Sequence, residues 1–124
     1  MPDLTVTLLQ ADLVWEQIDA NLAMFGDRID RLDTPTDLIV LPEMFTTGFS
    51  MSAAELAEPM EGRAVAWLRA SAAAKGVTIT GSLMIQDCGR YFNRLVWARP
   101  DGSLAAYDKK HLFRYAGEEK VFTA

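Results

Sequence analysis

The sequence predicts an α/β fold built around a parallel sheet. Two short apolar runs with β-branched residues, Leu4 to Leu9 and Leu38 to Leu41, are typical of buried strands. Between these runs, apolar residues recur at spacings of four and three, which is typical of one face of an amphipathic helix over residues 18–32. A strand, a helix and a strand within this length predict a right-handed βαβ unit with parallel strands.

One more helix is predicted in the second half of the chain, from about Arg63 to Lys75. Its apolar residues Val65, Leu68 and Ala72 share one face, as packing against a core requires. Gly76 suits the position just after a helix end, where a left-handed backbone conformation is common.

Three further strands are predicted after this helix, at residues 77–85, 91–98 and 104–107. Pro100-Asp101-Gly102 predicts a tight turn that makes the last two strands a hairpin. The tail, residues 108–124, shows no clear period. We therefore expect about five strands, and the buried parallel ones need packing layers on both faces of the sheet.

The composition indicates one globular domain and argues against several classes of partner. Half of the 124 residues are hydrophobic, and no apolar run approaches the roughly 20 residues that span a bilayer. The net charge of -5 argues against nucleic acid and against anionic membranes. A single cysteine excludes an intrachain disulfide, and the first residues lack a signal-peptide pattern, so we expect a cytoplasmic protein.

Glu43 is the first residue that could carry chemistry. It follows the predicted strand at 38–41 by one proline, and functional groups of open α/β folds gather beyond the carboxyl ends of strands. Its neighbours Pro42, Met44 and Phe45 predict partial desolvation, which makes a carboxylate a better base. The alternative interpretation is a surface glutamate that opens a loop.

A basic block, Asp108 to Phe113, follows the last predicted strand. A lysine here can place positive charge where an oxyanion develops, and the alternative is a solvated basic turn. Because neighbouring side chains of an extended segment face opposite ways, at most one of Lys109 and Lys110 points into a common site. The physical pattern favours neither lysine.

His111 and Cys88 are given structural interpretations. One histidine with scattered carboxylates forms no zinc pattern, so we expect no metal and interpret His111 as a structural hydrogen-bonding residue. Cys88 lies in a predicted hairpin turn, without a helix N-terminus to lower the pKa of its thiol. We therefore interpret Cys88 as an exposed cysteine without a catalytic role.

The two candidate segments together resemble a known family. Leu-Pro-Glu-Met-Phe-Thr-Thr-Gly-Phe at 41–49 resembles the glutamate motif of the nitrilase, or carbon–nitrogen hydrolase, superfamily. Tyr-Asp-Lys-Lys-His-Leu-Phe at 107–113 resembles its lysine motif, and the order and separation of the motifs also fit. Within the superfamily, residues 46–49 and 111–114 resemble the bacterial ω-amidases most closely.

The resemblance implies both a fold and the residues of a site. The implied fold is part of a nitrilase-type four-layer α-β-β-α sandwich, with residues 1–124 as the N-terminal part of a single domain. Glu43 matches the general base that activates a cysteine thiol, and Lys109 matches the lysine that stabilises the oxyanion. Glu118 matches a second, supporting glutamate, although its neighbour Glu119 is an alternative match.

The resemblance further implies where the substrate lies and where the nucleophile is found. Phe49 and Phe113 are expected to line the substrate. The family's cysteine nucleophile lies a few dozen residues beyond the lysine, and Cys88 precedes Lys109 and does not match it. We therefore expect a fragment, a truncated reading frame or one piece of a split gene, which is inactive by itself.

The implied function is an amidase that releases ammonia from a small ω-amide such as α-ketoglutaramate or α-ketosuccinamate. The expected partner is this small-molecule amide, with no cofactor, no metal, no nucleic acid and no membrane. Members of the family pair through their helices, so a homo-oligomer is expected. The alternatives are another enzyme of the superfamily, such as a carbamoylase or a nitrilase, and an inactive chain that only pairs with a partner.

Overall fold

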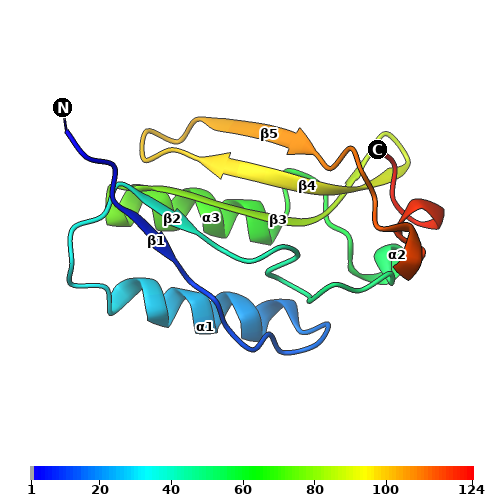
Figure 1. Cartoon of the computed structure of the whole chain (residues 1–124), viewed down its shortest axis with the longest axis horizontal. Coiled ribbons are helices and arrows are strands. Elements are labelled where there is room, and N and C mark those ends of the chain that lie inside the picture. Colours follow the sequence, from blue (N-terminus) through cyan, green and yellow to red (C-terminus); the bar gives the residue numbers. More distant parts are fainter. Residues whose placement is uncertain (1) are drawn as a thin grey trace.

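The computed structural model describes residues 2–124, which form one five-stranded mixed sheet with two long helices. The strands follow chain order across the sheet: β1 (Val6–Leu8), β2 (Leu38–Val40), β3 (Thr78–Asp87), β4 (Arg90–Ala98) and β5 (Leu104–Asp108). Strands β1, β2 and β3 are parallel, whereas β3, β4 and β5 run antiparallel to their neighbours. Figure 1 shows β1 and β5 at opposite edges of the sheet, as this order requires.

The two long helices, α1 (Ile18–Asp30) and α3 (Arg63–Lys75), lie where the apolar periodicity predicts them. Gly76 follows α3 with a φ of 72°, which confirms its left-handed position. The short helices α2 (Ala53–Leu56), η1 (Arg114–Ala116) and η2 (Glu118–Lys120) were not predicted, because one turn is too short to show a period. Within residues 2–124, no helix combines the length and the apolar character that crossing a membrane requires.

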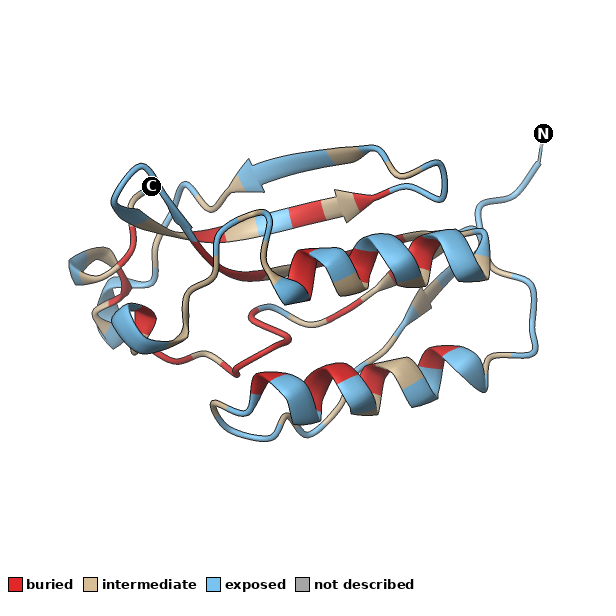
Figure 2. Cartoon of the chain, turned by 180° about the vertical axis from the view of Figure 1, so that it is seen from behind, coloured by how far each residue is buried: buried red, intermediate tan, exposed pale blue. Residues whose placement is uncertain are grey.

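The main core lies between the two long helices and one face of the sheet. Alternate strand residues such as Ile39, Ile79 and Val96 are fully buried there, together with Phe25 of α1 and Leu68 of α3. Figure 2 shows both helices on the near side of the sheet, each with its buried residues along one side. Burial of each large apolar side chain contributes about 1.5–3 kcal/mol, so this face holds the sheet and the helices together.

The opposite face of the sheet carries exposed apolar side chains, and the prediction that the first strand is buried is wrong. Leu8 is 72% exposed and Val6 is 42% exposed, because β1 is an edge strand and both long helices pack on the other face. The strand register places Leu95 of β4 and Tyr107 of β5 on the same uncovered face. An apolar sheet face of this kind is what one half of a sandwich presents to its second sheet.

Candidate functional site

Glu43 lies in the turn that follows β2. Met44 has a left-handed φ of 53°, which costs a residue with a side chain about 1–2 kcal/mol. Two hydrogen bonds to β3 stabilise this turn: the Met44 N–H donates to Ser82 Oγ at 2.9 Å, and the Phe45 N–H donates to the Ser82 carbonyl at 3.1 Å. The turn therefore brings Glu43 to the edge of the uncovered sheet face.

Gly81 of β3 allows this turn to approach the sheet closely. A Cβ atom at position 81 would lie 2.9 Å from the Cβ of Leu41 and 2.9 Å from a ring carbon of Phe45. Both neighbours are buried in the core, so neither can move aside without disturbing it. A side chain at position 81 would consequently displace the segment that carries Glu43.

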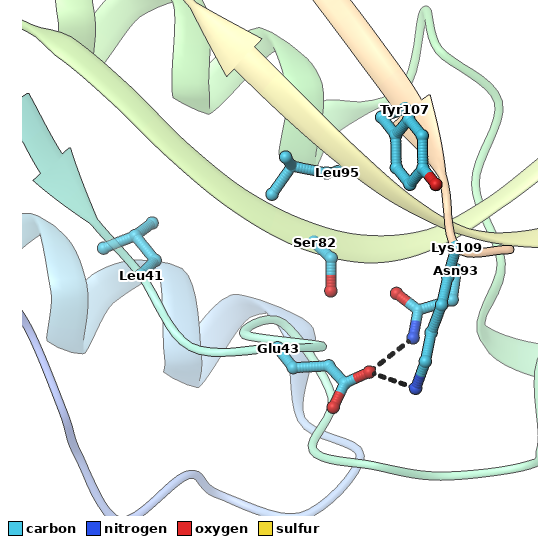
Figure 3. Close-up of a pocket in the computed structure, with 7 residues that line it drawn as sticks. All are labelled: Leu41, Glu43, Ser82, Asn93, Leu95, Tyr107 and Lys109. Atoms are coloured by element: carbon cyan, nitrogen blue, oxygen red, sulfur yellow. Dashed lines mark hydrogen bonds and ion pairs between the residues drawn. The ribbon is translucent and has the colours of Figure 1, made fainter. Parts of the chain in front are cut away.

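Lys109 follows β5 and meets Glu43 from the other side. Its Nζ lies 2.8 Å from Oε2 of Glu43, although 66 residues separate the two in the chain. Figure 3 shows the two side chains pointing toward each other. Lys110, the next residue, is exposed and lines a different cavity, as the alternation of an extended segment requires. Lys109, and not Lys110, is therefore the lysine that the structure brings to the glutamates.

Glu118 is completely buried and is the second carboxylate beside Lys109. Gly117, with a φ of 80°, reverses the chain between η1 and η2 and turns Glu118 inward. Oε1 of Glu118 lies 3.0 Å from Lys109 Nζ and accepts a hydrogen bond of 2.6 Å from the Phe113 N–H. Glu119 makes no such contact, and its buried Oε2 has no hydrogen-bond partner within residues 2–124. Of the two adjacent glutamates, Glu118 is the one that contacts the lysine.

Asn93 of β4 connects these side chains and was not among the predicted site residues. Its Nδ2 donates to Oε2 of Glu43 at 2.9 Å and to Oε2 of Glu118 at 3.0 Å. The backbone carbonyl oxygen of Asn93 accepts a hydrogen bond of 2.9 Å from the backbone N–H of Lys109. One feature of the sequence indicates a role for Asn93: asparagine is unfavourable inside a strand, and Asn93 interrupts the predicted strand at 91–98.

Hydrogen bonds keep Glu118 and Lys109 in their charged forms despite burial. Burial acts to raise the pKa of Glu118, but hydrogen bonds from Phe113, Asn93 and Lys109 outweigh it, and the pKa is lowered. Burial likewise acts to lower the pKa of Lys109, but its bonds to Glu43 and Glu118 outweigh it, and the pKa is raised. The cluster therefore combines an ammonium with a buried carboxylate at neutral pH.

Glu43 is more exposed than the sequence predicted. Its side chain is 48% exposed, because the apolar neighbours Met44 and Phe45 turn into the two cores instead of covering it. The prediction that these neighbours desolvate the carboxylate is therefore wrong for this chain. Oε2 of Glu43 accepts from both Asn93 and Lys109, whereas Oε1 has no hydrogen-bond partner within residues 2–124. Oε1 is thus available to accept a proton from a bound group.

Two adjoining cavities open beside the cluster. The first has a volume of about 290 Å³ and is drawn in Figure 3. Its lining residues are Leu41, Glu43, Ser82, Asn93, Leu95, Tyr107 and Lys109. The second, of about 460 Å³, is lined by Glu43, Phe49, Lys109, His111, Leu112 and Phe113. Glu43 and Lys109 line both cavities, and each volume suits a small molecule.

The two predicted substrate-lining phenylalanines lie beside the lysine. The ring centre of Phe49 is 5.3 Å from Lys109 Nζ, within the range of a cation–π contact. The ring of Phe113 lies 6.2 Å from that of Phe49, centre to centre.

His111 also lines the second cavity, together with Phe49 and Phe113. Its side chain is exposed and makes no hydrogen bond within residues 2–124. The interpretation of His111 as a structural hydrogen-bonding residue is therefore wrong.

Cys88 lies away from the cluster, at the tip of the β3–β4 hairpin. Its thiol is exposed, and a hydrogen bond with Asp87 raises its pKa, so the reactive thiolate is disfavoured. The hairpin separates Cys88 from Asn93 by more than about 10 Å of extended strand. Cys88 is the single cysteine of the sequence, so no thiol of this chain lies beside Glu43. Residues 2–124 also bring together no group of three metal-binding side chains.

Comparison with known proteins assigns the chain to a family. Residues 5–124 match the model of the carbon-nitrogen hydrolase family. The chain is similar to the omega-amidase YafV of Yersinia enterocolitica, with 44% identity over 100% of the chain and 48% of that protein. It is also similar to the 2-oxoglutaramate amidase of Bacillus subtilis, with 28% identity over 97% of the chain and 48% of that protein.

A solved structure matches equally well. The chain superimposes on a CN-hydrolase superfamily protein from Xanthomonas campestris with a TM-score of 0.95 and 44% identity, over 100% of this chain and 47% of that one. The chain thus spans about half the length of the curated relatives that it matches. The nitrilase-type fold that the motifs implied is confirmed over this half. The chain belongs to the carbon-nitrogen hydrolase family.

Proposed function

We propose that this chain supplies the glutamate and lysine of an ω-amidase, which hydrolyses the C–N bond of a small ω-amide such as α-ketoglutaramate and releases ammonia. The observation that carries the proposal is the Lys109 ammonium between Glu43 and Glu118, beside two cavities of small-molecule size. The similarity to an omega-amidase and to a 2-oxoglutaramate amidase supports the substrate class.

Glu43 is the general base of this mechanism. Its Oε1 takes the proton from a cysteine thiol, and the resulting thiolate attacks the amide carbon. The C–N bond breaks, and ammonia leaves with the proton that Glu43 carried. Water then hydrolyses the thioester after giving a proton to Glu43, and the acid product and the free thiol result. The side chain of Glu43 is suited to this shuttle because Oε2 is held while Oε1 is not.

Lys109 stabilises the oxyanion that forms when the thiolate attacks. An ammonium has three N–H groups, and two of them face Glu43 and Glu118. The third is available to the substrate oxygen, and the raised pKa of Lys109 keeps the positive charge in place. Glu118 has a supporting role, because its buried carboxylate fixes the position of the ammonium.

The aromatic pair Phe49 and Phe113 lines the substrate on the side of the second cavity. Their rings offer flat apolar contact to the short carbon chain of an ω-amide. The partner of this site is consequently a small amide, and no cofactor enters the reaction.

The cysteine nucleophile belongs, in this proposal, to the half of the domain that relatives carry and this chain does not match. We call this chain together with that half the complete domain. The uncovered sheet face, with Leu8, Leu95 and Tyr107, is the surface on which the second half packs. The chain by itself is then inactive, and the complete domain forms a homo-oligomer through helices.

Ammonia release by the complete domain tests the proposal. The assay compares α-ketoglutaramate with an N-carbamoyl amino acid and an aliphatic nitrile at equal concentrations. The proposal predicts the highest kcat/KM for α-ketoglutaramate and no turnover by residues 1–124 alone. Preference for the carbamoyl compound or the nitrile would assign the site to another reaction of the family. Absence of turnover of all three would support a chain that only pairs with a partner.

A further inference from the structure

We infer that Asn93 is a positioning residue of this site, which orients the Glu43 carboxylate so that Oε1 faces the reacting group. The inference deepens the proposed function and rests on it. Asn93 takes no part in the chemical steps of Glu43 and Lys109, but its buried side-chain amide contacts both Glu43 and Glu118.

Asn93 contacts all three charged residues of the cluster. Both hydrogens of its Nδ2 are used, one by Glu43 at 2.9 Å and one by Glu118 at 3.0 Å. Its backbone carbonyl accepts the Lys109 N–H at 2.9 Å, which fixes the start of the lysine side chain. Asn93 is only 1% exposed, so solvent does not compete for these bonds. A single strand residue thus determines the spacing of the two carboxylates and the lysine.

The orientation of the Asn93 amide follows from its neighbours. Ionised carboxylates accept hydrogen bonds and cannot donate them, so the NH₂ group must face Glu43 and Glu118. A flipped amide would set Oδ1 against both carboxylates. In the observed orientation Oδ1 is buried without a hydrogen-bond partner within residues 2–124. Because an unpartnered buried acceptor destabilises a fold, the arrangement favours the carboxylates at the expense of stability, as functional sites do.

The consequence for Glu43 is that its two oxygens are not equivalent. Oε2 accepts from Asn93 and from Lys109, which approach it from different elements, whereas Oε1 accepts from neither. The last torsion of a glutamate side chain is intrinsically broad, and a single contact to the flexible lysine would leave the carboxylate able to rotate. With Asn93 in place, Oε2 is anchored at two points and Oε1 is left free of both contacts.

Asn93→Leu in the complete domain tests this role. Leucine has nearly the shape of asparagine but donates no hydrogen bond, so it retains the packing and removes the anchor. We expect kcat for α-ketoglutaramate to fall about 10- to 100-fold, the range for losing a hydrogen bond to a charged group, with KM within about threefold. The acid limb of the pH profile should also move to higher pH, because the charged Glu118 carboxylate loses a donor that lowers its pKa. Asn93→Ser, whose hydroxyl is one bond too short to reach either carboxylate at these distances, should change kcat and the acid limb in the same direction as Asn93→Leu.

Thr80→Val is the matched control. Thr80 Oγ1 of β3 donates a buried hydrogen bond of 2.8 Å to the Val96 carbonyl of β4, the strand that carries Asn93, but outside the cluster. Its loss should lower stability and leave kcat and the acid limb unchanged.

The role of Asn93 is overturned if Asn93→Leu and Asn93→Ser both retain the kcat and the acid limb of wild type. It is also overturned if the two variants change only stability, as Thr80→Val does. Failure of the proposed function gives a different result, because the wild-type complete domain itself would then not hydrolyse α-ketoglutaramate. In that case the inference fails together with the function on which it rests.

Discussion

Replacing Glu118 by glutamine tests whether the buried carboxylate holds the cluster together. The substitution keeps the shape of the side chain but turns one acceptor oxygen into a donor. Both oxygens of Glu118 accept hydrogen bonds in the protein: Oε1 accepts from Phe113 and Lys109, and Oε2 accepts from Asn93. Either orientation of the new amide therefore sets a donor against a donor.

The least costly orientation turns the new NH₂ group toward Asn93, because the two bonds at the other oxygen are then retained. The variant still loses one hydrogen bond to a charged group, worth about 1.5–3 kcal/mol, and the ion pair with Lys109. We expect Glu118→Gln to lower the free energy of unfolding by about 2–4 kcal/mol near neutral pH. Urea-induced unfolding of the complete domain measures this difference.

The pH dependence of this difference provides a second test. The pKa of Glu118 in the folded protein lies below its ordinary value of 4.5, so its stabilising effect is complete above that value. The effect is lost as the pH falls through the folded pKa, whereas glutamine does not titrate. The difference in unfolding free energy between wild type and Glu118→Gln should therefore shrink as the pH falls below 4.5.

Glu119→Gln is the control for Glu118→Gln. Glu119 follows Glu118 directly, yet one of its oxygens has no hydrogen-bond partner within residues 2–124, so this change should stay within about 0.5 kcal/mol. Equal losses for the two variants would refute the reasoning. So would a loss for Glu118→Gln that stays constant as the pH is lowered.

Three further outcomes are expected. Cys88→Ser should leave amide hydrolysis by the complete domain unchanged. Loss of ammonia release in this variant would make Cys88 the nucleophile. Phe49→Ala and Phe113→Ala should raise KM for α-ketoglutaramate more than they lower kcat; a change in kcat alone would contradict their substrate contact. Residues 1–124 alone should self-associate in sedimentation experiments through the exposed sheet face with Leu8 and Tyr107. Leu8→Lys should weaken this association. A monomer that shows no association would contradict this expectation.

The regular elements were predictable because burial imposes a period on them. The bounds of α3 agree with the prediction, and the strands differ from it by a few residues, since their apolar positions follow the core face. The exposure of Val6 and Leu8 in β1 was not predictable from the composition of this strand. Its apolar run is the same on a covered and on an uncovered sheet, and only the packing of both helices on one face leaves Leu8 exposed.

The site was predictable only in part. Glu43 and Lys109 are 66 residues apart, and their physical patterns alone did not connect them; the family resemblance did. Glu118 and Glu119 are equivalent in the sequence, and a left-handed turn at Gly117 decides which of them is turned inward. Asn93 was missed as a site residue because its hydrogen-bond partners, Glu43 and Glu118, lie on other elements that the sequence alone does not bring beside its strand.

The most direct test of the proposed site is the comparison of Lys109→Ala with Lys110→Ala in the complete domain. The two lysines are adjacent, but of the two only Lys109 has its ammonium within 3.0 Å of the carboxylates of Glu43 and Glu118. We predict that Lys109→Ala lowers kcat for α-ketoglutaramate by at least about 10²–10³, the usual effect of losing an oxyanion donor. Lys110→Ala should stay within a few-fold of wild type, and Lys109→Arg should also fail, because a planar guanidinium does not replace a compact ammonium. Unfolding measurements on the same variants separate lost chemistry from lost stability. A larger loss for Lys110→Ala, or equal losses for the two alanine variants, would contradict the assignment of Lys109.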